Sequence, residues 1–267
     1  MQLSELLLPW LCVVVLAAFY ALVFRVLLRR RVSKVLAWLA FAGAVGVVAL
    51  AVAGFYLMPI RTSLAAGLMS EFQAATSFGA MFQLALLYAA LPEEAVKIGV
   101  VLLLLTLFPG RLRHRSEPAE LLLYAALGFA MSESLLYVAG FSLMPQVKEH
   151  LMGFALMRGF LGSLLHALLG MVAGSALALS WQTRWRWLGA GVGYGSAVLL
   201  HASFDGSLLH LVFTTMSGRS GNLVVDAGPA VAPFLASSVA LLVFAVAGMW
   251  SSRRLAEAPP IVELPQK

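Results

Sequence analysis

The chain has 267 residues, of which 61% are hydrophobic and only 11% are charged. Together with a mean hydropathy of +0.93, this composition excludes a soluble globular protein and indicates a polytopic membrane protein. The formal charge of +6 does not indicate nucleic-acid binding, because the basic residues gather in particular loops. The single cysteine, Cys12, lies in the first apolar run. This excludes an internal disulfide and a cysteine-based metal site.

Seven apolar segments follow one another along the chain, each long enough to cross a bilayer as a helix of about 20 residues or more. We therefore predict an all-α fold, a bundle of about seven transmembrane helices that forms a single domain over residues 1–250. Residues 251–267 are predicted to be a cytoplasmic tail without ordered structure, because they are rich in proline and charge. The segments cover residues 6–28, 35–58, 78–108, 120–143, 151–181, 187–213 and 230–250.

The basic residues predict the orientation of the bundle. Loops that hold many lysines and arginines stay in the cytoplasm. Seven spans with this asymmetry place the N-terminus outside and the C-terminus in the cytoplasm. The loops after the first, third, fifth and seventh segments hold Arg29, Arg30, Arg31, Lys34, Arg111, Arg113, Arg115, Arg184, Arg186, Arg253, Arg254 and Lys267; the opposite loops hold only Arg61, Lys148 and Arg219.

The third segment carries three charges near its middle, at Glu93, Glu94 and Lys97. Each such charge costs about 2.5 to 3.5 kcal/mol at the bilayer centre, so the three cost about 8 to 10 kcal/mol. The surrounding aliphatic residues contribute only about 6 kcal/mol of favourable insertion free energy. The segment thus needs partners on other helices or a water-filled cavity. Pro92 directly precedes the two acids, so we expect a kink or two helical pieces that meet at Leu91.

Four successive segments each carry an ionisable residue near their middle. At about 1.5 Å per residue, Glu93, Glu133, His166 and His201 fall at similar depths. Their convergence predicts a buried functional site. Residues four apart share a helix face, which brings His201 together with Asp205.

Simpler explanations exist for some of these residues. Glu94 and Lys97 can form an internal ion pair that lowers the insertion cost. A lone histidine in a membrane span can serve as a hydrogen-bond partner for a neighbouring helix. Arg158 can steady the site, bind a substrate carbonyl or take part in helix packing. We read the glycines, Gly170 and Gly174 among them, as close-packing positions between helices.

The ordered set of these residues resembles the signature of the PrsW family of intramembrane proteases, within the superfamily of CAAX prenyl endopeptidases and bacteriocin-processing enzymes. The resemblance covers about residues 80–211, and four motifs in order are specific where any one of them is weak. Two positions depart from the family pattern: Ser134 stands where an asparagine is common, and Gly170 where a threonine is common. The motifs are Glu93-Glu94-x-x-Lys97, Gly128-Phe129-x-x-x-Glu133 with Tyr137, Arg158 leading to His166, and His201-x-x-x-Asp205.

The resemblance implies hydrolysis of a peptide bond in or near the membrane, with a catalytic core over about residues 78–213. The expected substrate is a single-span membrane protein, such as an anti-sigma factor, or a peptide precursor. The expected partners are this substrate and the lipid bilayer, and the expected location is the bacterial plasma (inner) membrane. Rival functions from other classes are a proton-coupled transporter or channel and a non-catalytic membrane scaffold.

The predicted mechanism uses Glu93 as general base on a water molecule held jointly with His166. Glu94 pairs with Lys97, and His201 with Asp205 stabilises the oxyanion. Glu133 completes the hydrogen bonds of the water, and Glu93 and Glu94 could exchange roles. We favour a mechanism without a metal cofactor.

The alternative is a zinc ion bound by Glu133, His166 and His201, with Glu93 still the base. Excess negative charge in a low dielectric favours this alternative, because a divalent cation would relieve it.

Overall fold

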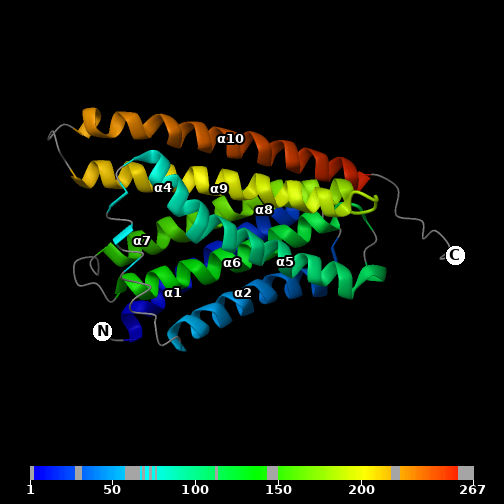
Figure 1. Ribbon diagram of the computed structural model, residues 1–267. Coiled ribbons are helices and arrows are strands. Elements are labelled where there is room, and N and C mark those ends of the chain that lie inside the picture. Colours follow the sequence, from blue (N-terminus) through cyan, green and yellow to red (C-terminus); the bar gives the residue numbers. More distant parts are fainter. Residues whose placement is uncertain are drawn as a thin grey trace.

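The computed structural model describes residues 3–27, 32–57, 67, 70–71, 74–75, 77–111, 114–142, 150–217 and 223–257, and these residues contain helices and no strand. The helices run side by side as one elongated bundle (Figure 1). Their bounds are α1 Leu3–Leu27, α2 Lys34–Leu57, α4 Phe78–Ala85, η1 Leu86–Ala90, α5 Leu91–Leu107, η2 Pro109–Arg111, α6 Glu117–Ser142, α7 Leu151–Met157, η4 Arg158–Gly162, α8 Ser163–Ser180, α9 Arg186–Ser217 and α10 Leu223–Glu257.

These elements form seven helical rods, because α4, η1 and α5 join into one rod and α7, η4 and α8 into another. Each predicted apolar segment corresponds to one rod. Helix α10 differs most, because it continues through Glu257, beyond the predicted boundary at residue 250. The rest of the predicted tail, residues 258–267, lies outside the described residues. The two described ends of the chain, at α1 and α10, lie at opposite ends of the bundle (Figure 1).

Five of the described helical stretches are long and apolar enough to cross a membrane, namely residues 7–27, 34–55, 117–142, 151–180 and 231–255. The two remaining rods are 78–107 and 186–217. The first holds Glu93, Glu94 and Lys97, and the second holds His201 and Asp205. Thus the two rods that are less apolar than a typical membrane span carry much of the candidate site. Which end of the bundle faces the cytoplasm stays a prediction from the loop charges.

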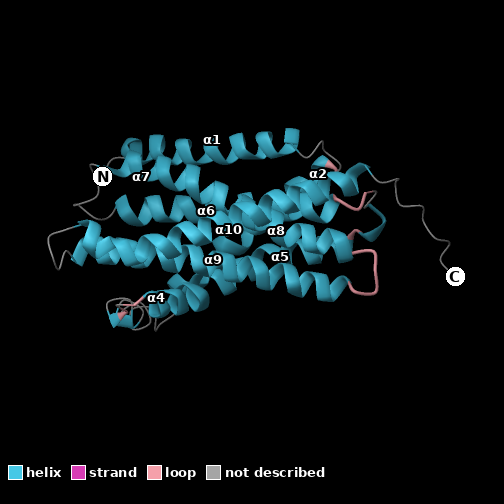
Figure 2. Ribbon diagram, turned by 90° about the horizontal axis from the view of Figure 1, so that it is seen from above, coloured by secondary structure: helices cyan, strands magenta, loops and turns pink. Residues whose placement is uncertain are grey.

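Helices α6 and α8 lie in the middle of the bundle in both views (Figures 1 and 2). Leu121 and Leu122 of α6 and Leu169 of α8 are fully buried in the main hydrophobic core. The outer helices instead expose large apolar side chains, for example Trp38 on α2 and Val239 on α10. This distribution fits a protein whose outer surface meets lipid acyl chains, since lipid does not penalise exposed apolar groups.

Small residues allow α6 and α8 to approach closely. A Cβ atom added to Gly170 would lie 2.8 Å from Ala126 Cβ and 3.0 Å from the Leu122 carbonyl oxygen. One added to Gly174 would lie 2.7 Å from Ala119 Cα. The interpretation of these two glycines as packing positions is confirmed. A threonine side chain at position 170 would collide with α6.

The predicted interruption before the two acids is present. Residues 86–90 form a π-helical turn, in which the Leu91 N–H donates to the Leu86 carbonyl oxygen, and α5 begins at once with Pro92 in its first turn. The Tyr194 hydroxyl of α9 donates to the Leu91 carbonyl oxygen at 3.0 Å. A second π-helical turn, η4, begins at Arg158. Such turns often occur at functional sites, and both lie beside the ionisable residues.

Candidate active site

The eight ionisable residues of the four motifs converge at one place inside the bundle. Helix α5 supplies three of them, α6 supplies one, α7–η4–α8 supplies two and α9 supplies two. The predicted convergence is therefore present in the structure. These residues are Glu93, Glu94, Lys97, Glu133, Arg158, His166, His201 and Asp205.

Lys97 and Glu94 form the deepest part of the cluster. Lys97 Nζ lies 2.6 Å from Glu94 Oε1, and the two side chains are 0% and 2% exposed. The ammonium group also contacts His166 Nδ1 at 2.7 Å and lies 4.8 Å from the centre of the Phe129 ring. Glu94 Oε1 is in addition 2.9 Å from His201 Nδ1. This buried ion pair thus fixes the inner edges of both histidine rings.

These contacts define the hydrogen-bonding state of His166. A protonated lysine can only donate hydrogen bonds, so Nδ1 of His166 accepts one. In the neutral ring the hydrogen then lies on Nε2, which donates to Glu133 Oε2 at 2.9 Å. On His201 the Nδ1–H donates to Glu94. Both imidazole rings are therefore held at their inner nitrogen and point Nε2 toward the outer part of the cluster.

Glu93 lies opposite these two Nε2 atoms. Its Oε2 is 4.0 Å from His166 Nε2 and 3.8 Å from His201 Nε2. The atom is buried and has no hydrogen-bond partner among the described residues. A buried carboxylate oxygen is costly to leave unpaired. The distances leave room for one small bridging species between the acid and the two histidines.

Glu133 and Arg158 form the side of the cluster next to His166. Arg158 Nη2 lies 2.8 Å from Glu133 Oε2 as an ion pair, and the guanidinium lies 4.2 Å from the centre of the Tyr137 ring. Arg158 Nε and Nη2 are buried without a hydrogen bond of good geometry among the described residues. Ser134 Oγ, at the position that departs from the family pattern, donates to the Arg158 carbonyl oxygen at 3.4 Å.

Asp205 completes the cluster on the side of His201. Its Oδ2 lies 3.2 Å from His201 Nε2, one helical turn away on α9. The predicted shared face of the two residues is therefore confirmed. His201 is surrounded by carboxylates of Glu94, Asp205 and Glu93. This arrangement stabilises a positive charge on the His201 ring.

Exposure divides the cluster into two layers. The inner layer consists of Glu94, Lys97, His166 and His201, and all four side chains are buried. The outer layer consists of Glu93, Glu133, Arg158 and Asp205, whose side chains are 16% to 27% exposed. The outer layer is thus the more exposed side of the cluster.

Three of these residues could together hold a metal ion. One ligand atom each from Glu93, His166 and His201 lies within 4.8 Å of the other two. Two histidines and one carboxylate match a catalytic zinc site, and Glu94 on Nδ1 of His201 matches the usual support of a zinc ligand. The unpaired oxygen of Glu93 also suits a cation. The donor set therefore fits zinc if both histidines lose their Nε2 hydrogen, His201 from beside Asp205 and His166 while Lys97 supports its Nδ1.

The zinc alternative predicted from the sequence contained Glu133 in place of Glu93. In the structure, Glu133 turns to Arg158 and the Nε2 atom of His166. Glu93, which was predicted to act only as base, is the acid grouped with both histidines. Glu133 is engaged by Arg158 at 2.8 Å, whereas Glu93 lies opposite both histidine Nε2 atoms at 4.0 Å and 3.8 Å.

Sequence reasoning did not assign a role to Tyr194 or Phe129. Tyr194 lies seven residues before His201, which is two helical turns on the same face, so the spacing was a usable signal. Its hydroxyl supports the backbone next to Pro92. Phe129 belongs to the second motif, but its position under the Lys97 ammonium is a tertiary contact that spacing does not predict.

Comparison with protein families gives a match over most of the chain. The family model described as PrsW family intramembrane metalloprotease covers residues 9–227, which include every residue of the cluster. No curated protein and no solved structure matches the chain. The match extends well beyond the four motifs, to α1, α2 and the start of α10. The chain therefore belongs to the PrsW family of intramembrane metalloproteases and is an integral membrane enzyme.

Proposed function

We propose that this enzyme hydrolyses a peptide bond of a single-span membrane protein or of a peptide precursor, with Glu93 as the general base that activates water. Family membership supports the protease over a transporter or a scaffold. The position of Glu93 supports its role as the base. Its unpaired oxygen lies 4.0 Å and 3.8 Å from the Nε2 atoms of the two histidines.

A water molecule suits this position, because it can donate to the carboxylate and lie within hydrogen-bond distance of an imidazole. Glu93 takes a proton from the water while the water oxygen attacks the carbonyl carbon of the scissile peptide bond. The same carboxyl group then returns the proton to the departing amine. Neither proton transfer requires another acid, since one carboxyl group serves in both steps.

His201 is suited to stabilise the oxyanion that forms during the attack. Its Nδ1 is fixed by Glu94, and its Nε2 is directed to the outer layer beside Asp205. Asp205 and Glu94 favour the charged imidazolium, which donates a stronger hydrogen bond to a developing negative charge. Glu133 orients His166, which helps to position the water.

Arg158 is suited to hold the substrate backbone. Its Nε has no hydrogen-bond partner among the described residues, and the guanidinium is kept in place by Glu133 and the Tyr137 ring. A substrate carbonyl oxygen would satisfy this donor. This role extends the active site toward the residues that flank the cleaved bond, where a protease needs to fix the extended chain.

A zinc-dependent form of the reaction is the second candidate. Glu93, His166 and His201 would hold the ion, as supported by their mutual distances. When bound, zinc would lower the pKa of a coordinated water and polarise the substrate carbonyl. The cluster contains four carboxylates and two fixed cations, Lys97 and Arg158. A divalent cation would balance this charge, and Glu133, whose Oε2 lies 2.9 Å from His166 Nε2, would then act as base.

The two candidates differ in a cleavage assay with purified enzyme and a single-span reporter protein in detergent. Glu133→Gln tests the base of the zinc form, and Glu93→Gln tests the base of the favoured form. We expect Glu93→Gln to abolish cleavage while the variant keeps its thermal stability, and Glu133→Gln to retain a measurable rate. Unchanged cleavage by Glu93→Gln would contradict both candidates.

A further inference from the structure

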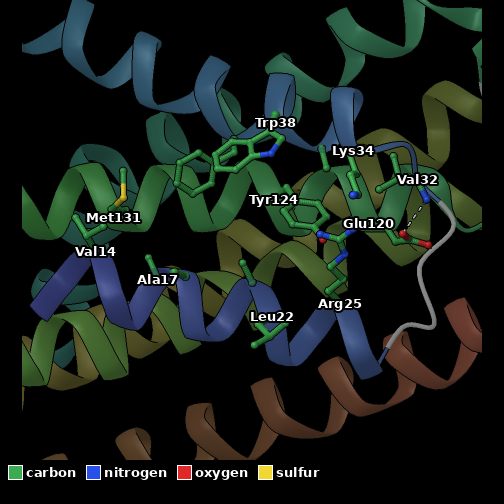
Figure 3. A pocket seen from close by; sticks show the side chains of 14 residues that line it. Val14, Ala17, Leu22, Arg25, Val32, Lys34, Trp38, Glu120, Tyr124 and Met131 are labelled. Atoms are coloured by element: carbon green, nitrogen blue, oxygen red, sulfur yellow. Dashed lines mark hydrogen bonds between the residues drawn. The ribbon is translucent and has the colours of Figure 1, made fainter. Parts of the chain in front are cut away.

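A groove separate from the active-site cluster lies between α1, α2 and α6 (Figure 3). Its volume is about 520 Å³, and none of its lining residues belongs to the cluster. Most of the lining is apolar, from Val14 and Met131 at one end to Tyr124 near the other. The family signature residues do not use this groove, so its chemistry calls for a separate explanation.

The groove is polar at one end only. Arg25 of α1 and Lys34 of α2 reach this end from two sides, next to Glu120 of α6 (Figure 3). Glu120 is held by the protein, because its Oε2 accepts from the Val32 N–H at 3.0 Å and its Oε1 from Ser116 Oγ at 3.4 Å. With two cations and one acid, this end keeps a net positive charge, and the two cationic side chains offer donors that suit a phosphate group.

The length of the groove suits one leaflet of a bilayer. Glu120 and Met131 line its two ends on α6, and eleven residues of helix correspond to about 16 Å. This is about half of the 30 Å hydrocarbon thickness. The positive-inside prediction places Arg25 and Lys34 at the cytoplasmic surface, where lipid headgroups lie.

The groove opens to the outer surface of the bundle. Leu22 and Trp38 line it and are 58% and 68% exposed. A lipid can therefore enter sideways from the surrounding bilayer. We propose that this groove binds an anionic phospholipid, with one acyl chain along α6 and the phosphate between Arg25 and Lys34.

A substrate helix is a poorer occupant. A transmembrane helix crosses the full hydrocarbon core of about 30 Å, whereas the groove ends near Met131, about half-way. An apolar helix also offers no negative group for the cationic end. An acyl chain with a phosphate headgroup matches both the length and the charge of the groove.

Native mass spectrometry of the full-length protein in detergent can test this proposal. The probes are phosphatidylglycerol and phosphatidylcholine with identical acyl chains. One net positive charge near an anionic lipid contributes about fivefold in affinity, so we expect wild type to prefer phosphatidylglycerol by about fivefold. Arg25→Gln with Lys34→Gln should remove this preference. Arg184→Gln, an exposed cation outside the groove, should keep it.

A second pair of variants tests the apolar part of the groove. Ala18→Phe fills it from α1, and we expect both lipids to lose at least tenfold in affinity. Ala236→Phe is the matched control, because Ala236 is also exposed and lies on α10 outside the groove. Melting temperatures equal to that of wild type verify folding.

Three results would overturn the proposal. The first is equal binding of the two lipids by wild type, and the second is unchanged binding in both groove variants. The third is that the groove variants bind lipid as wild type does but have a raised KM for a single-span reporter. That result would assign the groove to the substrate. Lipid binding is measured without catalysis, so failure of the proposed reaction would not affect these outcomes.

Discussion

The two layers of the active site differ in what their charges contact. In the inner layer, Glu94 and Lys97 are paired with each other and with the histidine rings, and solvent is excluded. In the outer layer, Glu93 is next to Glu94 in the sequence but keeps a buried oxygen without a hydrogen bond to the described residues. This difference in contacts supports the proposed division of roles, in which Glu94 holds the site together and Glu93 acts in catalysis.

Glu93→Gln should produce the largest loss. Removal of a general base lowers the rate by about 10²- to 10⁴-fold. The substitution keeps the size of the side chain, so the melting temperature should stay close to that of wild type. The measurement is kcat for a single-span reporter, with Glu71→Gln as control, since Glu71 is an exposed glutamate that contacts Tyr88. A normal kcat for Glu93→Gln would contradict the assignment of Glu93, in the outer layer, as the general base.

Lys97→Met should mainly affect stability. It leaves Glu94 as a buried charge without its partner, which costs about 3–5 kcal/mol of unfolding free energy. Thermal unfolding in detergent measures the loss. The double variant Glu94→Gln with Lys97→Met replaces the ion pair by neutral groups and should recover part of the stability. No recovery would show that the charges act separately, and a stable single variant would contradict the structural role of the inner layer.

Asp205→Asn should have a moderate effect on the reaction. It removes the carboxylate at 3.2 Å from His201 Nε2, and a hydrogen bond to a charged group contributes about 1.5–3 kcal/mol. We expect kcat to fall by about tenfold to a hundredfold, with KM nearly unchanged. A rise in KM at constant kcat would instead assign Asp205 to substrate binding.

Gly170→Thr should have the smallest effect. The new side chain would meet Ala126 and Leu122 of α6, and overpacking costs about 1–3 kcal/mol. Gly191→Thr is the matched control, because no described atom lies within 4 Å of a Cβ added there. The activity of the folded fraction should stay unchanged. Higher stability of Gly170→Thr would show that the helices can separate at this crossing.

Much of the fold could be predicted from the sequence. Long apolar runs set the seven helical rods, because a membrane-spanning helix must be continuous and apolar. Pro92 correctly predicted a break before the acids. The end of α10 was harder to place, since the polar residues 251–257 still continue a helix. Hydropathy reports where the lipid ends rather than where the helix ends.

The candidate site was predictable as a set of residues but not as a network. Four mid-span ionisable groups in neighbouring helices are costly unless they meet. Spacing also identified the His201–Asp205 pair. It did not predict that Glu94 contacts both Lys97 and His201, or that Glu93 rather than Glu133 lies between the histidines. Those contacts depend on how each helix is rotated about its axis, and packing against other helices sets that rotation.

The most direct test of the proposed mechanism is the metal dependence of cleavage. The purified enzyme would be treated with a chelator, its metal content measured, and its cleavage of a single-span reporter compared before and after. With Glu93 as the base and no metal ion, full activity should remain at a metal content far below one ion per chain. Loss of activity after chelation, with recovery when one equivalent of zinc is added, would contradict this mechanism and support the zinc form at Glu93, His166 and His201.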